Sequence, residues 1–304
     1  MAGNRVCVIG LGSMGLGIAG SLLRGGFAVV GCDVSAEARV RFADLGGQVA
    51  AVHREAAVGA DVVIVVVVNA SQTEAVLFGP QGAAAVMEKG AVIVSCATMA
   101  PDAARGFAGR AQALGLGYLD APISGGAVRA AAGEMTIMAS GPAAAFDLVR
   151  PVLDCIAAKV YELGDAAGTG AAFKIVNQLL AGVHIAAACE AITLAQAMGL
   201  DLAKVYEVIT ASAGNSWMFE NRVPHILNGD YAPQSAVDIF TKDLGIVTDI
   251  GRGLNFPTPV AAMALQMFVM TAAAGMGRDD DASVARMLAG LAGLELPGLK
   301  QKKD

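Results

Sequence analysis

The chain of 304 residues has few charged and few aromatic side chains. Only 16% of the residues are Asp, Glu, Lys or Arg, aromatic residues make up 5%, and there is one tryptophan. Acidic residues outnumber basic residues by 27 to 21, which gives a formal net charge of -6. Because proteins bind a nucleic-acid backbone mainly through clustered Lys and Arg, we expect no nucleic-acid partner.

The 3 histidines and 5 cysteines are scattered along the chain, and no two cysteines form a Cys-x-x-Cys pair. Zinc sites need closely spaced ligands, and disulfide frameworks usually need an even number of cysteines. The sequence therefore predicts no metal site and small buried thiols in a reducing compartment. Since no apolar signal segment precedes the first strand pattern, we expect a cytoplasmic protein.

Apolar residues are abundant, at 55% of the chain, and residues 253–277 contain no charge. That length is sufficient to span a bilayer. However, Asn255, Pro257 and Pro259 interrupt its first third, and the apolar run at 62–68 is too short to span. We therefore expect no membrane segment. Instead, the apolar surface should be buried inside the fold and between the subunits of a homodimer or homotetramer.

Up to about residue 165, short apolar runs alternate with helical patterns. The runs lie at residues 5–9, 27–33, 62–68, 91–95, 118–119, 135–138 and 160–162. Continuous Val and Ile runs are typical of strands buried on both faces, and their alternation with helices indicates βαβ units in a parallel sheet. We predict a doubly wound α/β domain over residues 1–165.

After Gly164 the strand signal disappears. Residues 170–198 predict one long helix that is apolar almost all round, with Lys174 and Glu190 as its only charges. A helix without a polar face must be buried. Further helical patterns cover residues 202–212, 218–227, 237–252, 260–274 and 283–291. We predict an all-α domain over residues 166–297 and a polar tail at 298–304.

A glycine motif separates the first strand from the first helix, and all six of its residues are candidate dinucleotide contacts: Gly10, Leu11, Gly12, Ser13, Met14 and Gly15. Its glycines allow a tight turn, close approach of a pyrophosphate and helix packing on the sheet. Asp33 ends the second strand, where an acid suits a ribose 2′-hydroxyl and repels a 2′-phosphate. Since residues 34–36 contain no arginine, we predict NAD as cofactor, with NADP as a poorer substitute.

Two further clusters carry candidate chemistry. The segment Asp120-Ala-Pro-Ile-Ser124-Gly125-Gly126 offers backbone N–H groups beside a hydroxyl, which suits a small carboxylate, although a purely structural turn explains the same residues. Lys174 and Asn177 share a helix face. Desolvation in a cleft would lower the pKa of Lys174 from about 10.4 toward the range useful for acid–base catalysis. The alternative is a surface lysine with its stem on apolar neighbours.

In their order and spacing, these motifs resemble the β-hydroxyacid dehydrogenases, relatives of 3-hydroxyisobutyrate dehydrogenase and 6-phosphogluconate dehydrogenase. The resemblance covers residues 8–15, 120–126 and 168–177, together with Lys242-Asp-Leu on a later helix, and so extends over essentially the whole chain. It implies a Rossmann-type domain followed by a helical domain of the 6-phosphogluconate dehydrogenase type. It also implies NAD-dependent oxidation of a small 2- or 3-hydroxy acid by hydride transfer.

The resemblance also implies roles for individual residues. Lys174 would be the catalytic acid–base, and Asn177 would hold the reacting oxygen or the carboxylate. The substrate carboxylate would be bound by Ser124, Gly125 and Gly126. The cofactor would meet Val68, Asn69 and Thr98 at strand ends, and Lys242 would lie near both cofactor and substrate. Alternatively, Thr98 and Asn69 only cap turns, and Lys242 is an ordinary i,i+4 surface charge.

For the substrate, residues 215–231 and 235–245 are similar to family members that oxidise C2 of L-threonate to 2-dehydro-L-erythronate. Asn215, Ser216, Arg222 and His225 would supply polar partners for such a polyhydroxy acid. Equally, Arg222 and His225 could face water while Trp217 and Phe219 join two helices. The alternatives within the family are oxidation of 3-hydroxyisobutyrate and reduction of tartronate semialdehyde. An alternative of another class is a catalytically inactive NAD-binding scaffold.

Overall fold

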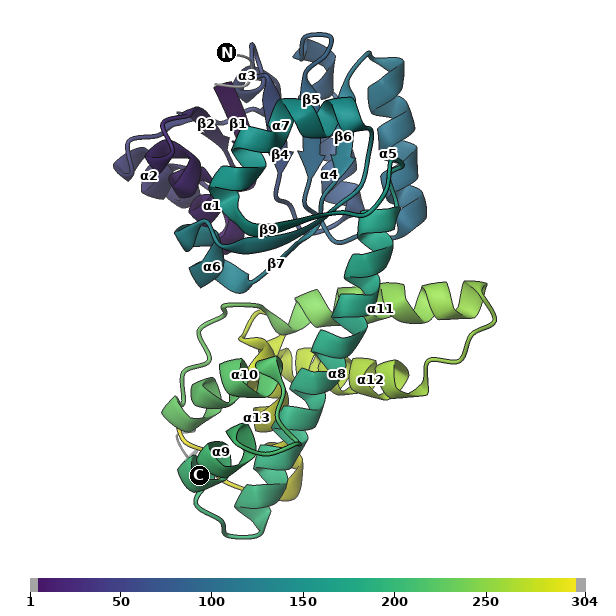
Figure 1. Cartoon of the computed structure of the whole chain (residues 1–304). Coiled ribbons are helices and arrows are strands. Elements are labelled where there is room, and N and C mark those ends of the chain that lie inside the picture. Colours follow the sequence, from purple (N-terminus) through teal and green to yellow (C-terminus); the bar gives the residue numbers. More distant parts are fainter. Residues whose placement is uncertain (1–4, 299–304) are drawn as a thin grey trace. The chain divides into compact units, whose positions relative to one another are not determined.

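The computed structural model describes residues 5–298 and divides the chain into two compact units, Met1–Ile175 and Val176–Asp304. The first unit is an α/β structure and the second is helical (Figure 1), which confirms the predicted fold class. Helix α8 (Thr169–Ala197) begins in the first unit and continues into the second, and it confirms the one long helix that the mostly apolar pattern over 170–198 predicts. The tail predicted at 298–304 lies, beyond Gly298, outside the described residues.

The first unit is built on a six-stranded parallel sheet with the order β3-β2-β1-β4-β5-β6. Its strands are β1 (Arg5–Ile9), β2 (Ala28–Cys32), β3 (Gln48–Ala50), β4 (Val62–Val65), β5 (Val92–Ser95) and β6 (Gly117–Asp120). The sequence patterns missed β3, because this edge strand is short and largely exposed. They also made β4 too long, since the chain leaves the sheet after Val65 to enter the helix that Asn69 caps.

Helices cover both faces of this sheet, and alternate residues of β1 belong to two separate cores. Val6 and Val8 lie in a core shared with α1 (Ser13–Arg24) and α7 (Ala143–Ile156). Cys7 and Ile9 lie in a second core shared with α4 (Ala70–Phe78) and α5 (Pro101–Ala113). This alternation is the expected result of a period-2 strand buried on both sides. The remaining helical segments are α2 (Ala36–Asp44), α3 (His53–Ala56), the 3₁₀ turn Ala84–Val86 and α6 (Gly126–Ala132).

A second, three-stranded sheet follows β6 in the chain. It consists of β7 (Ile123–Ser124), β8 (Met135–Ala139) and β9 (Ala157–Glu162), with β7 antiparallel and β9 parallel to β8. Both interpretations of residues 120–126, as a carboxylate-binding turn and as a structural turn, omitted the short strand that Ile123 and Ser124 form. These two residues form β7 because they pair with Ile137 and Thr136 of β8.

The second unit contains the remainder of α8 and further helical segments at the predicted positions. These are α9 (Leu202–Thr210), α10 (Trp217–Asn228), α11 (Val237–Gly253), α12 (Pro259–Thr271), the π-helical turn Ala272–Met276, the 3₁₀ turn Asp281–Ser283 and α13 (Val284–Ala292). Stacking of Phe240 on Phe268, with ring centroids 5.2 Å apart, joins α11 to α12.

Two helical stretches are long and apolar enough to cross a membrane by length and composition, Thr169–Ala197 and Pro259–Met276. One or two such helices are weak support for a membrane segment, because the core helix of a soluble protein passes the same test. The expectation that the chain has no membrane segment stays a prediction.

Candidate active site

The loops expected to hold the cofactor lie at one edge of the six-stranded sheet. The glycine loop follows β1, Val68 and Asn69 follow β4, and Thr98 follows β5. Strands β1, β4 and β5 are neighbours and parallel, so their carboxyl ends share that edge. The strand order reverses between β1 and β4, and in open α/β sheets ligands bind in the crevice at such a switch point.

The glycine loop has the geometry that a dinucleotide requires. Gly10 has a φ of +95°, and a Cβ added there would lie 2.4 Å from the carbonyl oxygen of Val66. A Cβ added at Gly15 would lie 1.8 Å from the Gly10 carbonyl oxygen, whereas at Gly12 it would meet nothing within 4 Å. The described residues supply no side-chain cap to the first turn of α1. The turn is therefore tight, and the first amides of α1 remain suited to a phosphate.

Asp33 lies beside this loop and bonds to it. Its Oδ2 accepts a hydrogen bond of 2.7 Å from the Leu11 amide, and its Oδ1 accepts one of 2.7 Å from the Ser35 amide. The guanidinium of Arg39 donates to the carbonyl oxygens of Asp33 and Val34 over 2.5 and 3.1 Å. Residues 34–36 contain no arginine, but α2 returns Arg39 to the end of β2, where it was not predicted.

Asn69 is used locally as a helix cap. Its Oδ1 accepts a 2.8 Å hydrogen bond from the Gln72 amide at the start of α4, and the Gln72 side chain accepts one of 2.9 Å from the Val68 amide. The capping alternative is therefore confirmed for Asn69, while its contact with a cofactor stays a prediction. Thr98 is half-buried in the loop after β5.

Lys174 is buried, with 7% of its surface exposed, and its Nζ donates a 2.8 Å hydrogen bond to the carbonyl oxygen of Ile123. The alternative of an exposed surface lysine is wrong. Ile123 directly precedes Ser124 in β7, and Gly125 and Gly126 follow with φ values of +134° and +76°, which favour glycine. The structure thus brings the Lys174 ammonium beside the predicted carboxylate-binding residues.

The start of α8, the helix that carries Lys174, is hydrogen-bonded to the end of β6 in the six-stranded sheet. Asp120, the last residue of β6, is 1% exposed, and its Oδ2 accepts hydrogen bonds from the amides of Gly168 and Ala171. Burial raises the pKa of the Asp120 carboxyl, although the two amides and the Ser140 hydroxyl act to lower it. Lys174 therefore lies on a helix that begins at the carboxyl edge of the sheet, where the cofactor loops are found.

In the second unit, Asn177 and Lys242 are linked through a buried carboxylate. Asn177 donates to Gln178 Oε1 over 3.0 Å, and Gln178 Nε2 donates to Asp243 Oδ2 over 2.5 Å. The Lys242 ammonium lies 2.5 Å from Asp243 Oδ1. Asp243 is 1% exposed. The alternative of an i,i+4 surface charge is wrong for Lys242, because its partner is the adjacent buried aspartate.

The polar residues of the 215–225 segment support the helical unit. Arg222 holds Asp281 through contacts of 2.6 and 3.1 Å, and the Nδ1 atom of His225 lies 2.9 Å from Asp280 Oδ1. The expectation that Arg222 and His225 face water is therefore wrong. Ser216 caps α10 by accepting from the Phe219 amide. Asn215 donates to the Thr210 carbonyl oxygen.

Two neighbouring aspartates in this region have shifted pKa values. Burial raises the pKa of Asp281 to about 6, against the opposing effect of the Arg222 guanidinium. Burial also acts to raise the pKa of Asp280. There, however, hydrogen bonds from the His225 ring and from the Ala282 and Gln234 amides outweigh burial and hold that pKa below its usual value.

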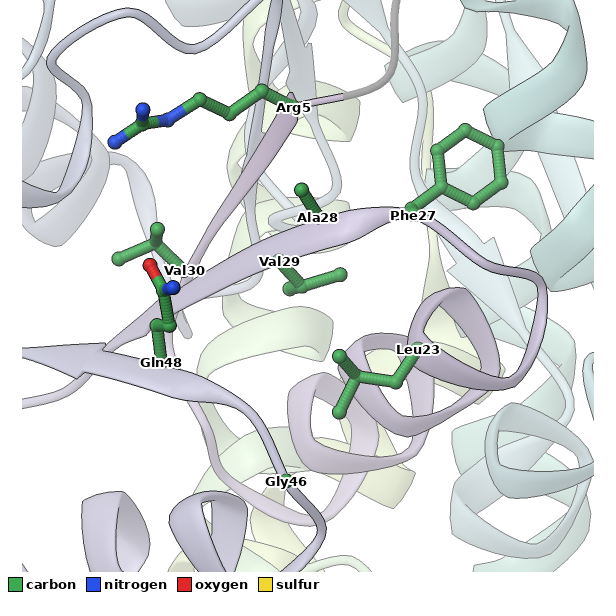
Figure 2. Close-up of a pocket in the computed structure, with 8 residues that line it drawn as sticks. All are labelled: Arg5, Leu23, Phe27, Ala28, Val29, Val30, Gly46 and Gln48. Carbon is green, nitrogen blue, oxygen red and sulfur yellow. The ribbon is translucent and has the colours of Figure 1, made fainter.

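A pocket of about 320 Å³ lies elsewhere, at the amino ends of β1, β2 and β3 (Figure 2). It is lined by Arg5, Leu23, Phe27, Ala28, Val29, Val30, Gly46 and Gln48. Because it lies at the amino ends of the strands, it is separate from the cofactor edge. Within residues 5–298, no group of three or more His, Cys, Asp or Glu side chains is arranged to hold a metal ion.

The switch-point crevice, the glycine loop with Asp33 and a buried lysine at the same edge define the class of nicotinamide-dinucleotide dehydrogenases. Two family models match the chain. The NAD binding domain of 6-phosphogluconate dehydrogenase matches residues 5–164, and the NAD-binding region of NADP-dependent 3-hydroxyisobutyrate dehydrogenase matches residues 168–288. The chain belongs to this family of β-hydroxyacid dehydrogenases. It is an NAD-dependent enzyme that acts on a small hydroxy acid, with NADP as a possible substitute.

Similar proteins match over nearly the full length of the chain. An L-threonate dehydrogenase from Cupriavidus necator is 57% identical over 97% of this chain and 98% of its own length. An L-threonate dehydrogenase from Escherichia coli is 47% identical over 97% of each chain. A crystal structure of 3-hydroxyisobutyrate dehydrogenase from Salmonella typhimurium is 48% identical, with a TM-score of 0.90 over 93% of this chain and 99% of its own.

Proposed function

We propose that this enzyme oxidises L-threonate at C2 to 2-dehydro-L-erythronate with NAD. The observation that carries the chemistry is the buried Lys174 ammonium, 2.8 Å from the Ile123 carbonyl oxygen and next to Ser124. The choice of L-threonate is supported by the relatives of that name at 57% and 47% identity.

In this proposal, Lys174 in its neutral form takes the proton of the substrate hydroxyl. Bound NAD supplies the acceptor for the hydride that leaves the same carbon. Asn177, three residues further along α8, holds the reacting oxygen or the carboxylate. The carboxylate is bound by Ser124, Gly125 and Gly126, whose left-handed backbone at both glycines exposes amide groups. Proton removal and hydride loss together convert the alcohol to a ketone, so no other oxidant is needed.

The cofactor is held along the carboxyl edge of the sheet. The pyrophosphate lies against Gly10, Leu11, Gly12, Ser13, Met14 and Gly15, where Gly12 has open space and α1 begins. Asp33, which already accepts from the Leu11 amide, would accept from a hydroxyl of the adenosine ribose. Val68, Asn69 and Thr98 line the remainder of the edge, and a contact of Lys242 with cofactor and substrate stays a prediction.

Oxidation of 3-hydroxyisobutyrate is the second candidate, supported by the name of the Salmonella structure. A screen of NADH production over L-threonate, D-threonate, D-erythronate, D-glycerate, tartrate and 3-hydroxyisobutyrate separates the two, and run in reverse with NADH it tests tartronate semialdehyde. We expect the highest kcat/KM for L-threonate. A higher value for any other acid contradicts the assignment. NADH formation from none of them would favour the inactive scaffold.

We also propose a cytoplasmic homodimer or homotetramer. The five cysteines are free thiols, which suits a reducing compartment. Helices α8 and α12 expose large apolar side chains, among them Leu194 at 60% and Met263 at 68% exposure. Where exposed apolar side chains gather into a large patch, the patch often marks a protein–protein interface. Light scattering on the purified protein tests this proposal, and a monomer at micromolar concentration contradicts it.

A further inference from the structure

The first turn of α8 is held by two side chains, one at the end of β6 and one directly after β8. The first amides of a helix have no partner within the helix and need an outside acceptor. Asp120 Oδ2 accepts from the amides of Gly168 and Ala171 over 2.9 and 2.8 Å. Ser140 Oγ accepts from the amide of Gly170 over 3.0 Å. Three amides around the helix start are thus bound by groups outside α8.

These two acceptors form one rigid support. Asp120 ends β6 and Ser140 follows β8, and their backbones exchange hydrogen bonds of 3.0 and 2.8 Å. Both residues are almost completely buried, with 1% and 0% exposure. A Cβ added at Gly170 would lie 2.4 Å from the Met138 carbonyl oxygen, so the helix start has little room to move on these strands.

Residues 120–126, which begin with Asp120, also contact the end of the Lys174 side chain. Ile123 accepts the hydrogen bond from Lys174 Nζ, and it lies three residues after Asp120. Lys174 likewise lies three residues after Ala171. The bonds Asp120–Ala171 and Ile123–Lys174 therefore fix α8 to this segment at two points. Ser124, Gly125 and Gly126 directly follow the second point.

We propose that Asp120 is a positioning residue for proton transfer. Its carboxylate oxygen fixes the position of α8 along the helix axis and its rotation about that axis. The Lys174 amine therefore lies beside Ser124 and reaches the substrate hydroxyl. The inference rests on the proposed role of Lys174 as the acid–base. All of the groups involved belong to the first unit. The requirement is for an acceptor oxygen at this place, and an asparagine can supply that oxygen.

The test compares Asp120→Ala with Asp120→Asn in the full-length enzyme, with saturating L-threonate and NAD. Because small displacements of a reacting group cost large factors in rate, we expect Asp120→Ala to lower kcat at least about tenfold. Asp120→Asn should keep kcat within about threefold of wild type. The Kd for NAD should change less than about twofold in both variants. The values are expressed per NAD-binding site, so that misfolded protein does not count as slow enzyme.

The deuterium isotope effect on kcat, measured with C2-deuterated L-threonate, supplies a reading that a purely structural role would not change. In Asp120→Ala we expect a larger isotope effect than in wild type, because the slower chemical step limits turnover more fully, and an unchanged isotope effect contradicts the positioning role. Asp201→Ala is the matched control, since one Asp201 oxygen also accepts from two amides at a helix start, those of Ala203 and Lys204. This control should keep the wild-type kcat.

Wild-type kcat per site in Asp120→Ala overturns the proposal, and so does an Asp120→Asn enzyme as slow as Asp120→Ala. If Asp120→Ala does not fold, Ser140→Ala removes only the acceptor for Gly170, and an unchanged kcat in that variant overturns the proposal. Lys174→Ala distinguishes the two levels. If the Lys174→Ala enzyme keeps wild-type turnover, the proposed function fails. If Lys174→Ala is inactive while Asp120→Ala has wild-type kcat, only the positioning role of Asp120 is rejected.

Discussion

The two units hold their functional groups in different ways. In the first unit the partners are mostly backbone groups, since the Lys174 ammonium bonds a carbonyl oxygen and Asp33 bonds the amides of Leu11 and Ser35. In the second unit the partners of Asn177, Lys242 and Arg222 are side chains. Asn177 reaches Asp243 through Gln178, and Arg222 binds Asp281 directly.

This difference follows from the elements available. Parallel strands end in loops with free amides and carbonyl groups, which can bind a ligand or hold a lysine. Helices satisfy most of their backbone groups internally, so polar side chains along a helix depend more on other side chains as partners. Loss of one member of a buried ion pair leaves the other charge buried without a partner. We therefore expect substitutions to affect mainly activity in the first unit and mainly stability in the second.

The largest effect is expected for Arg222→Met, which leaves Asp281 buried without its guanidinium. Breaking a buried pair in this way costs about 3–5 kcal/mol of unfolding free energy. Urea denaturation at pH 7 measures it. Arg252→Met is the matched control, because Arg252 and Asp249 form an exposed pair at 3.1 Å. Exposed pairs contribute at most about 1 kcal/mol. Equal losses of unfolding free energy in Arg222→Met and Arg252→Met would contradict the expected difference between a buried and an exposed ion pair.

Lys174→Ala tests the first unit. Loss of a general acid–base should lower kcat at least about a hundredfold, while NAD still binds. Steady-state kinetics and NAD titration measure the two effects. Lys159→Ala is the control, since Lys159 is exposed on β9 and lies over the Tyr161 ring. A Lys174→Ala enzyme with near wild-type turnover would reject the proposed mechanism.

Asp280 should make the stability of the second unit depend on pH. Hydrogen bonds from the His225 ring and from the Ala282 and Gln234 amides outweigh burial and hold its pKa in the folded chain below the usual aspartate value of about 3.9. Its stabilising contribution is therefore fully present well above that value, and is lost as the pH falls through the lower folded pKa. We expect Asp280→Asn to be less stable than wild type by about 1–2 kcal/mol at pH 7, with a smaller difference toward pH 3. Urea titrations across this range measure it. A difference that does not vary with pH would argue against the His225–Asp280 pair as its source.

Asp33→Ala should have the smallest effect, confined to cofactor choice. Without the carboxylate, the ribose loses a charged partner, so we expect about a tenfold loss of kcat/KM for NAD. The activity with NADP relative to NAD should rise, and Arg39 beside this site gives a 2′-phosphate a cation to approach. Parallel assays with both cofactors measure the ratio. An unchanged ratio would contradict the ribose role of Asp33.

Much of the fold could be predicted because its elements follow local patterns. The Val and Ile runs of β1 and β5 and the mostly apolar pattern of α8 identify these elements correctly. Two strands without such a run, β3 and β7, were missed. β3 is mostly exposed, and β7 has two residues whose strand conformation depends on pairing with β8. The position of Arg39 beside Asp33 was not predicted, because helix α2 brings Arg39 back to the end of β2.

The sequence by itself determined the element types, the order of the motifs and the family, because each depends on residues close together in the chain. Tertiary structure decided the partners. Gly168 bonds Asp120 across 48 residues, Gln178 bonds Asp243 across 65, and Arg222 bonds Asp281 across 59. Both uses considered for Arg222, a substrate contact or a solvated surface, fit the same local pattern. Which distant surface meets a side chain depends on the packing of whole elements, and only the folded chain fixes that.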